Sequence, residues 1–127
     1  MRLPDIDDLI ELHADCIETF GGAPGIRDRG ALEGSLARAA HIIAYTNHEV
    51  DVVDVAAAVC ASICRNHAFI DGNKRIAFIA LGIILELNGF YLDARELDAE
   101  ATMMKLASGM LPEDEFKAWV RVSAVPA

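Results

Sequence analysis

The chain has 127 residues and is 54% hydrophobic, which suffices for one domain with its own core but is too little for two domains of ordinary size. Its net charge of −9, from 11 basic and 20 acidic residues, argues against a protein that binds nucleic acid directly or covers an anionic membrane. The longest apolar run, residues 76–85, is too short to cross a bilayer, so we expect a single domain over residues 1–127 and no membrane span.

Apolar residues at helical spacing predict a first helix over residues 5–20, which Gly21-Gly22 stops. After the turn at Pro24-Gly25, a second helix is predicted over residues 31–40. Residues 41–50 carry no clear pattern, and we leave them unassigned.

The next two helices have clearer boundaries. Asp51 is a candidate cap for a third helix over residues 52–66, whose small side chains permit close packing. The fourth helix is predicted from residue 73 to residue 87, with Asn88-Gly89 as a left-handed stop. Because the fourth helix is apolar on nearly all sides, we expect it to lie at the centre of the domain.

Asp93 and Asp98 are two candidate starts for a fifth helix, which Ser108-Gly109 would end. Pro112 stands near the first turn of a sixth helix, which contains Phe116, Trp119 and Val120. No strand alternation is convincing anywhere in the chain. We therefore predict an all-α fold, a compact single-domain helical bundle of about six helices.

The three cysteines bear on the compartment and on metals. Cys16, Cys60 and Cys64 are odd in number and lack a framework spacing, and no charged-then-apolar leader precedes the acidic residues near the start, so we predict a cytoplasmic protein. A transition-metal site can be drawn from Cys60, Cys64 and His67. Because no fourth ligand is evident and buried cysteine packs as a small hydrophobe, we favour packing for both thiols.

The most informative segment lies between the third and fourth helices, where residues 67–75 read His-Ala-Phe-Ile-Asp-Gly-Asn-Lys-Arg. Between residues 65 and 75, in an otherwise acidic chain, four basic residues stand against one acid, Asp71: Arg65, His67, Lys74 and Arg75. Unpaired N–H groups and the positive dipole end at a helix N-terminus favour a phosphate. The pattern predicts an anionic ligand held where the fourth helix begins.

His67 is the candidate general base, because histidine is the side chain that exchanges a proton near neutral pH. Alone it would be interpreted as a histidine that contacts the last carbonyls of the third helix. Its position beside Asp71 and residues 73–75 favours catalysis. Phe69 alternates with His67 in the loop, so we predict that it points inward as an anchor.

Asp71 is the candidate metal ligand, because Mg²⁺ commonly takes one or two carboxylates together with phosphate oxygens and water. An N-cap of the fourth helix is its other common use, and the two are not exclusive. Gly72 lets the backbone approach a phosphate or adopt a positive φ. Asn73 is predicted either to cap the helix or to hydrogen-bond a phosphate oxygen, and both interpretations stay open.

Lys74 and Arg75 are candidate catalytic and phosphate-binding residues, because cations at a helix N-terminus oppose the dipole unless an anion offsets them. A nucleotide phosphate would do so. Arg65 lies two residues before His67 and is a candidate for the same anion; its alternative is a contact with the dipole at the C-terminus of the third helix.

Other residues have no local partner that selects a role. Three histidines are predicted to be packing or surface residues: His13, His41 and His48. Three methionines are predicted to pack in the core or against a partner: Met103, Met104 and Met110. The cluster Arg27-Asp28-Arg29 is interpreted as a solvated turn, with Arg27 a minor candidate for supporting the site.

Residues 67–75 resemble the active-site motif of the Fic/Doc superfamily, in the form His-x-Phe-x-Asp-Gly/Ala-Asn-Lys-Arg typical of Doc (death-on-curing) toxins. The similarity extends through Leu12-His13-x-x-x-Ile17, Gly21-Gly22, residues 24–28 and Asn88-Gly89. The resemblance implies a Mg²⁺-dependent enzyme that uses ATP and acts as the toxin of a type II toxin–antitoxin pair. It also implies a cognate antitoxin, whose C-terminal segment folds into a groove near the loop.

Two positions distinguish the chemistries of this family. AMP-transferring Fic proteins resemble His-Pro-Phe-x-x-Gly-Asn-Gly-Arg-x-x-Arg, whereas here Lys74 replaces the second Gly and Phe78 replaces the last Arg. In Doc toxins the same changes go with a nucleotide bound in the opposite sense, with its γ-phosphate at the attacking hydroxyl. The resemblance therefore implies a protein Ser/Thr kinase that inhibits translation, with a threonine of elongation factor Tu as the family's target.

Two alternatives remain. One is an AMP transferase of the Fic type, and the other is an inactive Fic-like binding module. The intact His67, Asp71, Asn73 and Arg75 count against the inactive module, because a decayed site has no need to keep them together.

Overall fold

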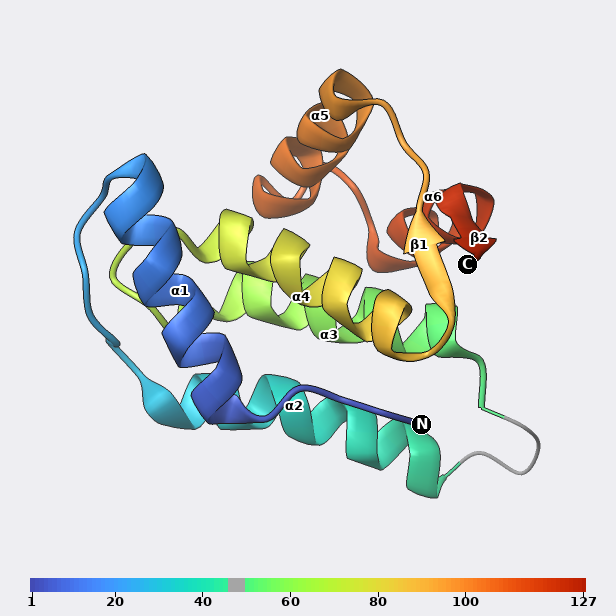
Figure 1. Ribbon diagram of the computed structural model, residues 1–127, viewed down its shortest axis with the longest axis horizontal. Coiled ribbons are helices and arrows are strands. Elements are labelled where there is room, and N and C mark those ends of the chain that lie inside the picture. The colour runs from blue at the N-terminus through green and yellow to red at the C-terminus, as the bar shows by residue number, and fades with distance from the viewer. Residues whose placement is uncertain (46–49) are drawn as a thin grey trace.

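Six α-helices and one two-stranded sheet make up the residues that the computed structural model describes, 1–45 and 50–127 (Figure 1). In chain order the elements are α1 (Ile6–Phe20), α2 (Arg29–Ala44), α3 (Val52–Asn66), α4 (Asn73–Leu87), β1 (Phe90–Leu92), α5 (Glu96–Ala107), α6 (Glu113–Ser123) and β2 (Ala124–Pro126). The prediction of a helical bundle of about six helices is confirmed. Within the described ranges, no helix has the length and apolarity that a bilayer-spanning segment needs.

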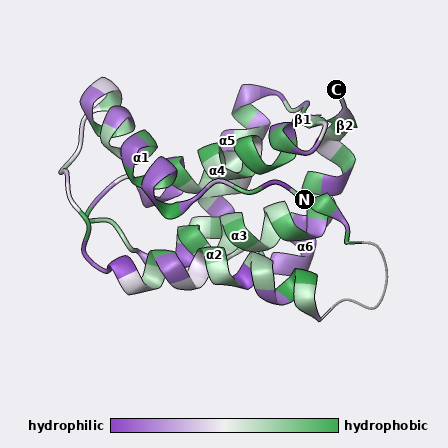
Figure 2. Ribbon diagram, turned by 60° about the horizontal axis from the view of Figure 1, so that its bottom comes forward, coloured by the Kyte–Doolittle hydropathy of each residue, from purple (hydrophilic) through white to green (hydrophobic). Residues whose placement is uncertain are grey.

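The core is built around α3, in which ten of fifteen residues are buried. α4 and α2 pack along α3. In Figure 2 apolar segments follow one another through the middle of α3, whereas polar and apolar segments alternate in α1. We expected α4 at the centre, and its residues 76–85 are all buried or half-buried, with no exposed surface on Ile76, Leu81 and Ile84. Only its ends are exposed, as at Leu87, which is 40% exposed. The alanines and cysteines of α3 allow its neighbours, α4 among them, to approach closely.

Aspartate caps explain where the first three helices begin. Asp51 caps α3 as predicted, and α3 has the predicted bounds. Asp5, the predicted first residue of α1, is instead its N-cap, so α1 begins at Ile6. Asp28 accepts a hydrogen bond from the N–H of Ala31 (3.1 Å), so α2 begins at Arg29, earlier than expected. It continues through residues 41–44, which the apolar pattern left unassigned.

The start of α5 differs from both candidates, because each aspartate has another partner. The backbone N–H of Asp93 donates to the carbonyl of Ser123 (2.7 Å), and the carboxylate of Asp98 accepts from the indole N–H of Trp119 (3.0 Å). Arg95 occupies the N-cap position without a side-chain hydrogen bond. The predicted stops are confirmed, since Gly89 and Gly109 both adopt positive φ after α4 and α5.

The expectation of no strands was wrong. β1 pairs antiparallel with β2, with Tyr91 opposite Val125, and the pair holds the end of the described chain beside the C-terminus of α4 (Figure 1). Strands of three residues are too short to show an alternation of apolar and polar side chains, so their pairing is a tertiary event. The loop between α3 and α4 lies at the other end of α4, beside α1.

Candidate functional site

The loop that joins α3 to α4 is bounded by two residues in the left-handed conformation. His67 is the C-cap of α3 with φ 49° and ψ 48°, and Gly72 is the N-cap of α4 with φ 77°. Among the described residues, His67 is the only non-glycine residue with positive φ. Such a backbone conformation costs about 1–2 kcal/mol and needs support from its surroundings, a combination that is frequent at functional sites.

The support comes from residues 25–28, which run alongside the loop. The carbonyl of Ala68 accepts hydrogen bonds from the N–H groups of Arg27 (2.8 Å) and Asp28 (2.9 Å), and Ile70 donates to the carbonyl of Gly25 (3.1 Å). Phe69 is 1% exposed, whereas His67 is exposed. The predicted alternation is confirmed: the aromatic ring anchors the loop and the imidazole faces solvent. Arg27 supports the site through its backbone.

Asn73 closes the loop from the helix side. Its Oδ1 accepts from the N–H of Phe69 (3.0 Å) and its Nδ2 donates to the carbonyl of the same residue (2.9 Å). The side-chain amide bonds backbone groups of the loop and does not cap the helix, because Gly72 occupies the cap position. A hydrogen bond from Asn73 to a phosphate oxygen stays a prediction.

His13 reaches the loop from α1, a contact that the sequence analysis did not anticipate. It is 3% exposed, its Nε2 lies 2.7 Å from the carbonyl oxygen of Asp71, and its ring stacks on Phe69 with a centroid separation of 3.7 Å. The prediction of a packing histidine agrees with its burial. One indication in the sequence that His13 is near the motif is the Leu12-His13 pattern in the first helix, but this pattern does not show which residue His13 contacts.

The carboxylate of Asp71 is exposed and has two neighbours. Its Oδ1 accepts from the N–H of Gly72 (2.9 Å) and its Oδ2 from the N–H of Ala23 (3.2 Å). A Cβ on Gly22 would lie 2.8 Å from Oδ2, so only glycine allows this segment to approach the carboxylate. The N-cap alternative for Asp71 was wrong, because Gly72 is the N-cap and no side chain caps α4.

Asp71 fits a magnesium ion that is held jointly with a ligand. In the described part of the chain Asp71 makes no ion pair, and no three His, Cys, Asp or Glu side chains cluster as a metal site. One carboxylate with free lone pairs suits Mg²⁺ when phosphate oxygens and water complete the shell. Burial raises the pKa of the Cys60 and Cys64 thiols, which disfavours the thiolates that a transition metal would require.

The N-terminus of α4 differs from every other helix start described. Asp5, Asp28 and Asp51 cap α1, α2 and α3, while α5 and α6 carry acidic residues in their first turns. α4 has neither a capping side chain nor a first-turn acid. Its first intrahelical N–H is that of Ile76, bonded to the carbonyl of Gly72 (3.0 Å), so the N–H groups of residues 73–75 are left for a ligand.

Lys74 and Arg75 add two exposed cations to this helix start. Neither makes an ion pair within residues 1–45 and 50–127, although the Arg75 guanidinium lies 4.4 Å from the ring centroid of Phe20. Both line an open groove of about 740 Å³ between α4, β1 and α5, together with Phe78. Within the described residues, no carboxylate therefore offsets the positive charge of Lys74, Arg75 and the helix dipole at the start of α4, as the sequence predicted.

Arg65 contacts residues that follow α5. Its Nη2 donates to the carbonyl of Leu111 (3.2 Å), and its Nη1 is 3.8 Å from Oε1 of Glu113. Arg65 is the basic residue in the last turn of α3, as the alternative contact with the helix dipole requires. Its contact with a phosphate stays a prediction. The last turn of α3 presents Arg65 to α6, where the carboxylate of Glu113 attracts it.

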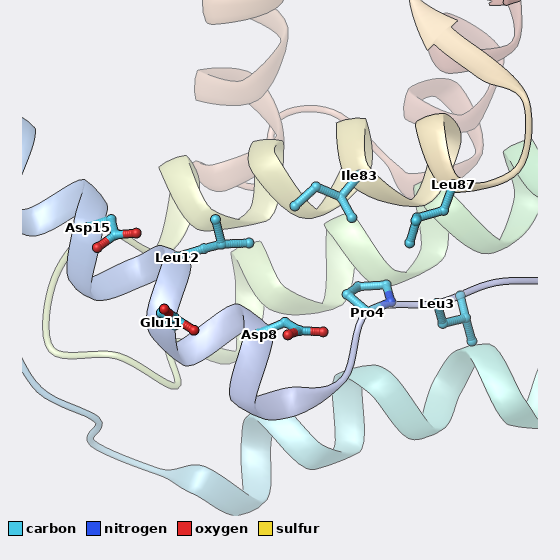
Figure 3. Close-up of a pocket in the computed structure, with 8 residues that line it drawn as sticks. All are labelled: Leu3, Pro4, Asp8, Glu11, Leu12, Asp15, Ile83 and Leu87. Carbon is cyan, nitrogen blue, oxygen red and sulfur yellow. The ribbon is translucent and has the colours of Figure 1, made fainter.

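A second hollow, of about 440 Å³, lies between α1 and α4 but contains none of residues 65–75 (Figure 3). Three carboxylates line it, from Asp8, Glu11 and Asp15, and Figure 3 shows them on α1 opposite Ile83 and Leu87. An acidic wall does not suit a phosphate. We therefore assign the anion site to the start of α4 alone.

The remaining predictions have mixed outcomes. Met103 is 3% exposed and packs in the core, whereas Met104 and Met110 are 55% and 77% exposed. His41 is exposed and lies against Tyr45, with 4.4 Å between ring centroids. His48 lies outside the described residues.

Comparison with known proteins adds independent findings. A family model described as "Fic/DOC family" matches residues 3–85. The chain is similar to "Toxin Doc" of Mycolicibacterium smegmatis (strain ATCC 700084 / mc(2)155), with 40% identity over 75 residues, 59% of this chain and 58% of that protein. It is also similar to "Protein kinase doc" of Escherichia phage P1, with 35% identity over 98 residues, 76% of this chain and 77% of that protein.

Proposed function

We propose that this chain, which belongs to the Fic/DOC family, is the toxin of a type II toxin–antitoxin pair and transfers the γ-phosphate of ATP to a protein hydroxyl. One observation carries the proposal. The start of α4 lacks both a cap and an acid, bears two cations without ion pairs in the described structure, and adjoins His67 and Asp71. The names of the two relatives, a toxin and a protein kinase, support it at the level of the family.

The binding part of the proposal uses the residues around the helix start. The N–H groups of residues 73–75 receive phosphate oxygens, and Lys74 and Arg75 offset their charge. Asp71 holds Mg²⁺ together with those oxygens, and the ion neutralises charge that develops on the phosphates. Gly72 keeps this surface free of a side chain, so that the phosphate lies close to the backbone.

The chemical part assigns proton transfer to His67. The target hydroxyl gives its proton to the imidazole as its oxygen bonds to the γ-phosphorus, while the bond from that phosphorus to the β–γ bridging oxygen breaks and ADP leaves. The exposed ring of His67 is accessible to a protein substrate. Its left-handed backbone, held by the carbonyl of Ala68, directs it away from the core.

Two residues favour phosphate transfer over AMP transfer. Lys74 brings length and charge where AMP-transferring relatives have glycine, and Phe78 stands where they have a second arginine. Lys74 and Phe78 both line the groove beside the helix start, so neither is buried away from a nucleotide. We propose the orientation with the γ-phosphate at His67, and a threonine of elongation factor Tu as target, with inhibition of translation in the cytoplasm as the result.

The same groove is the proposed site for a cognate antitoxin. Its wall carries apolar side chains from Phe20, Phe78 and Met103, and its volume of about 740 Å³ suits the side chains of an amphipathic helix. Glu86 and Glu100 also line it, so basic residues in the antitoxin segment would find partners. A segment seated there would cover Lys74 and Arg75, which explains neutralisation without a change in the fold.

Transfer of label from ATP tests the proposal directly. The purified protein is incubated with elongation factor Tu, Mg²⁺ and ATP labelled at either the α- or the γ-phosphate. We expect label from the γ position alone. Label from the α position would establish AMP transfer instead. No label from either position, with a Fic/DOC enzyme of known activity labelling its own target in parallel, would favour an inert binding module.

A matched pair of variants connects this experiment to the groove. Lys74→Gly restores the residue of AMP-transferring relatives, and Lys105→Gly changes an exposed lysine on α5 outside the groove lining. We expect Lys74→Gly to lose γ-phosphate transfer by at least about tenfold, as loss of a charge-assisted phosphate contact does, while Lys105→Gly keeps it. Equal transfer by both variants would remove Lys74 from the site.

A further inference from the structure

We infer that His13 of α1 is a positioning residue for Asp71, and that it sets the direction of the Asp71 carboxylate by holding one peptide group. The inference rests on the proposed function in one respect, the use of Asp71 as a ligand for Mg²⁺ and nucleotide. It adds a residue 58 positions away in the sequence, which lies outside the catalytic motif.

The peptide group between Asp71 and Gly72 is held at both of its polar atoms. Its carbonyl oxygen lies 2.7 Å from Nε2 of His13, and its N–H donates to Oδ1 of Asp71 (2.9 Å). Because a carbonyl only accepts, Nε2 of His13 must carry the proton. The plane of this peptide therefore determines where Oδ1 of Asp71 lies, and His13 determines the plane.

The ring of His13 is itself held in place. It stacks on Phe69 with 3.7 Å between centroids and 13° between planes, and Phe69 is anchored by Asn73. A Cβ on Gly72 would lie 3.4 Å from Nε2 of His13, in van der Waals contact with the ring, so His13 packs directly against the N-cap of α4. The imidazole thus acts as a rigid link between the packing of α1 and the acidic residue of the loop.

Packing alone does not account for a histidine at this position. The other buried residues of α1 are Leu9 and Cys16, both apolar, and an aliphatic side chain would fill the space without the cost of burying polar nitrogens. The hydrogen bond to Asp71 makes the histidine acceptable there. Since that bond ends on the backbone of the proposed metal ligand, its effect is expected in metal and nucleotide affinity.

Two substitutions separate the ring from its N–H group. His13→Phe keeps an aromatic ring against Phe69 and removes the donor, whereas His13→Gln removes the ring and keeps an N–H at similar reach. Cys16→Ala is the control for a change in the buried face of α1. For each variant, thermal unfolding reports stability, calorimetric titration reports affinity for ATP with Mg²⁺, and amide exchange reports protection of the Gly72 N–H without nucleotide.

We expect binding and stability to rank the variants in opposite orders. His13→Phe should weaken binding of Mg²⁺ and ATP by about tenfold, the typical effect of one lost hydrogen bond, and speed exchange of the Gly72 amide. His13→Gln should be the less stable protein but bind within about threefold of the natural chain. Half-maximal transfer by His13→Phe should need correspondingly more Mg²⁺, with the rate at saturation largely retained.

The outcomes separate this inference from the proposed function. Affinity that falls in both variants in proportion to their stability would reduce His13 to a packing residue, and unchanged affinity in His13→Phe would overturn the inference outright. If the natural chain binds no nucleotide, the proposed function fails. Gly72 exchange then decides: faster exchange in His13→Phe alone supports the positioning role, and unchanged exchange excludes it.

Discussion

The first three helices and the fourth begin in opposite ways. α1, α2 and α3 start at aspartates whose side chains accept hydrogen bonds from backbone N–H groups within the first turn, so those N–H groups are satisfied by the chain itself. α4 starts at Gly72, with no cap, and adds two cations. The chain satisfies the first-turn N–H groups of α1, α2 and α3 with its own side chains, but not those of α4, which is the helix beside the proposed site.

The surroundings of α4 show the same contrast along its length. Beyond its first turn the helix packs Ile76, Leu81 and Ile84 into the core without exposed surface. Before it, the loop is held by hydrogen bonds to backbone groups from Asn73, Arg27 and His13. Apolar packing tolerates small shifts, whereas hydrogen bonds set direction, which catalysis needs.

The largest expected effect on activity is that of His67→Ala. Loss of a general base lowers the rate by about 10²–10⁴-fold, while the exposed ring contributes little to the core, so unfolding and nucleotide binding should be nearly unchanged. The transfer rate, the unfolding curve and the affinity for ATP check this together. Undiminished transfer would exclude His67 as the base.

Leu81→Ala should show the converse profile. Leu81 has no exposed surface in α4, so its truncation should lower the free energy of unfolding by about 2–5 kcal/mol. Denaturant titration measures the change. If the variant remains folded, its affinity for ATP should be close to that of the natural chain, and a selective loss of affinity would show that the core and the loop are coupled.

A pair of aspartate variants compares a cap with a ligand. Asp28→Ala should lower the free energy of unfolding by about 1 kcal/mol, because it frees the N–H of Ala31 at the start of α2. Asp71 caps no helix, so Asp71→Ala should leave the free energy of unfolding nearly unchanged. It should instead weaken Mg²⁺-dependent binding of the nucleotide. An unchanged magnesium requirement in Asp71→Ala would place the metal elsewhere.

Lys74→Glu reverses the charge that opposes the dipole of α4. Without nucleotide we expect the variant to be more stable than the natural chain by a few tenths of a kcal/mol, because an acid in a first turn is favourable. Nucleotide binding should be lost. Lys105→Glu makes the same change of charge in the last turn of α5 and should keep binding. Tight binding of ATP by Lys74→Glu would contradict the proposal that the start of α4 binds the phosphates.

The smallest effect concerns acid stability at the junction of α2, α3 and α6. The hydrogen bond from Arg38 (2.6 Å) lowers the pKa of the Glu113 carboxyl below its usual range. A lowered folded-state pKa means that the pair stabilises the protein above the unfolded value of about 4.3, and that this contribution disappears as the pH falls through the folded value.

Glu113→Gln should therefore be less stable than the natural chain at pH 7, and the difference in stability should narrow as the pH falls below about 4.3. Thermal unfolding at several pH values measures this difference. A difference that stays constant at every acidic pH would mean that the ion pair contributes nothing. Arg65 also lies near Glu113, at 3.8 Å, so the variant should leave transfer activity intact if Arg65 has no part in the site.

The sequence was enough to predict six helices, with the observed bounds for α3 and α4, and to single out the loop between them. A helix begins at a cap such as Asp51 and ends at a stop such as Gly89, and both act on neighbours within one turn. Residues 67–75 bring an acid, a base and two further cations together within nine positions. The alternation of His67 and Phe69 is equally local. Such features are legible because their partners lie within a few residues.

Contacts between distant groups depend on the packing of the helices. The side chain of Asn73 bonds the backbone of Phe69, Arg65 lies near Glu113 of α6, and β1 pairs with β2 beside the C-terminus of α4. His13 meets Asp71 because the packing of α1 on α4 brings a buried ring to a backbone carbonyl 58 residues along the chain. Local spacing carries no information about such contacts, since the core sets them through the packing of whole helices.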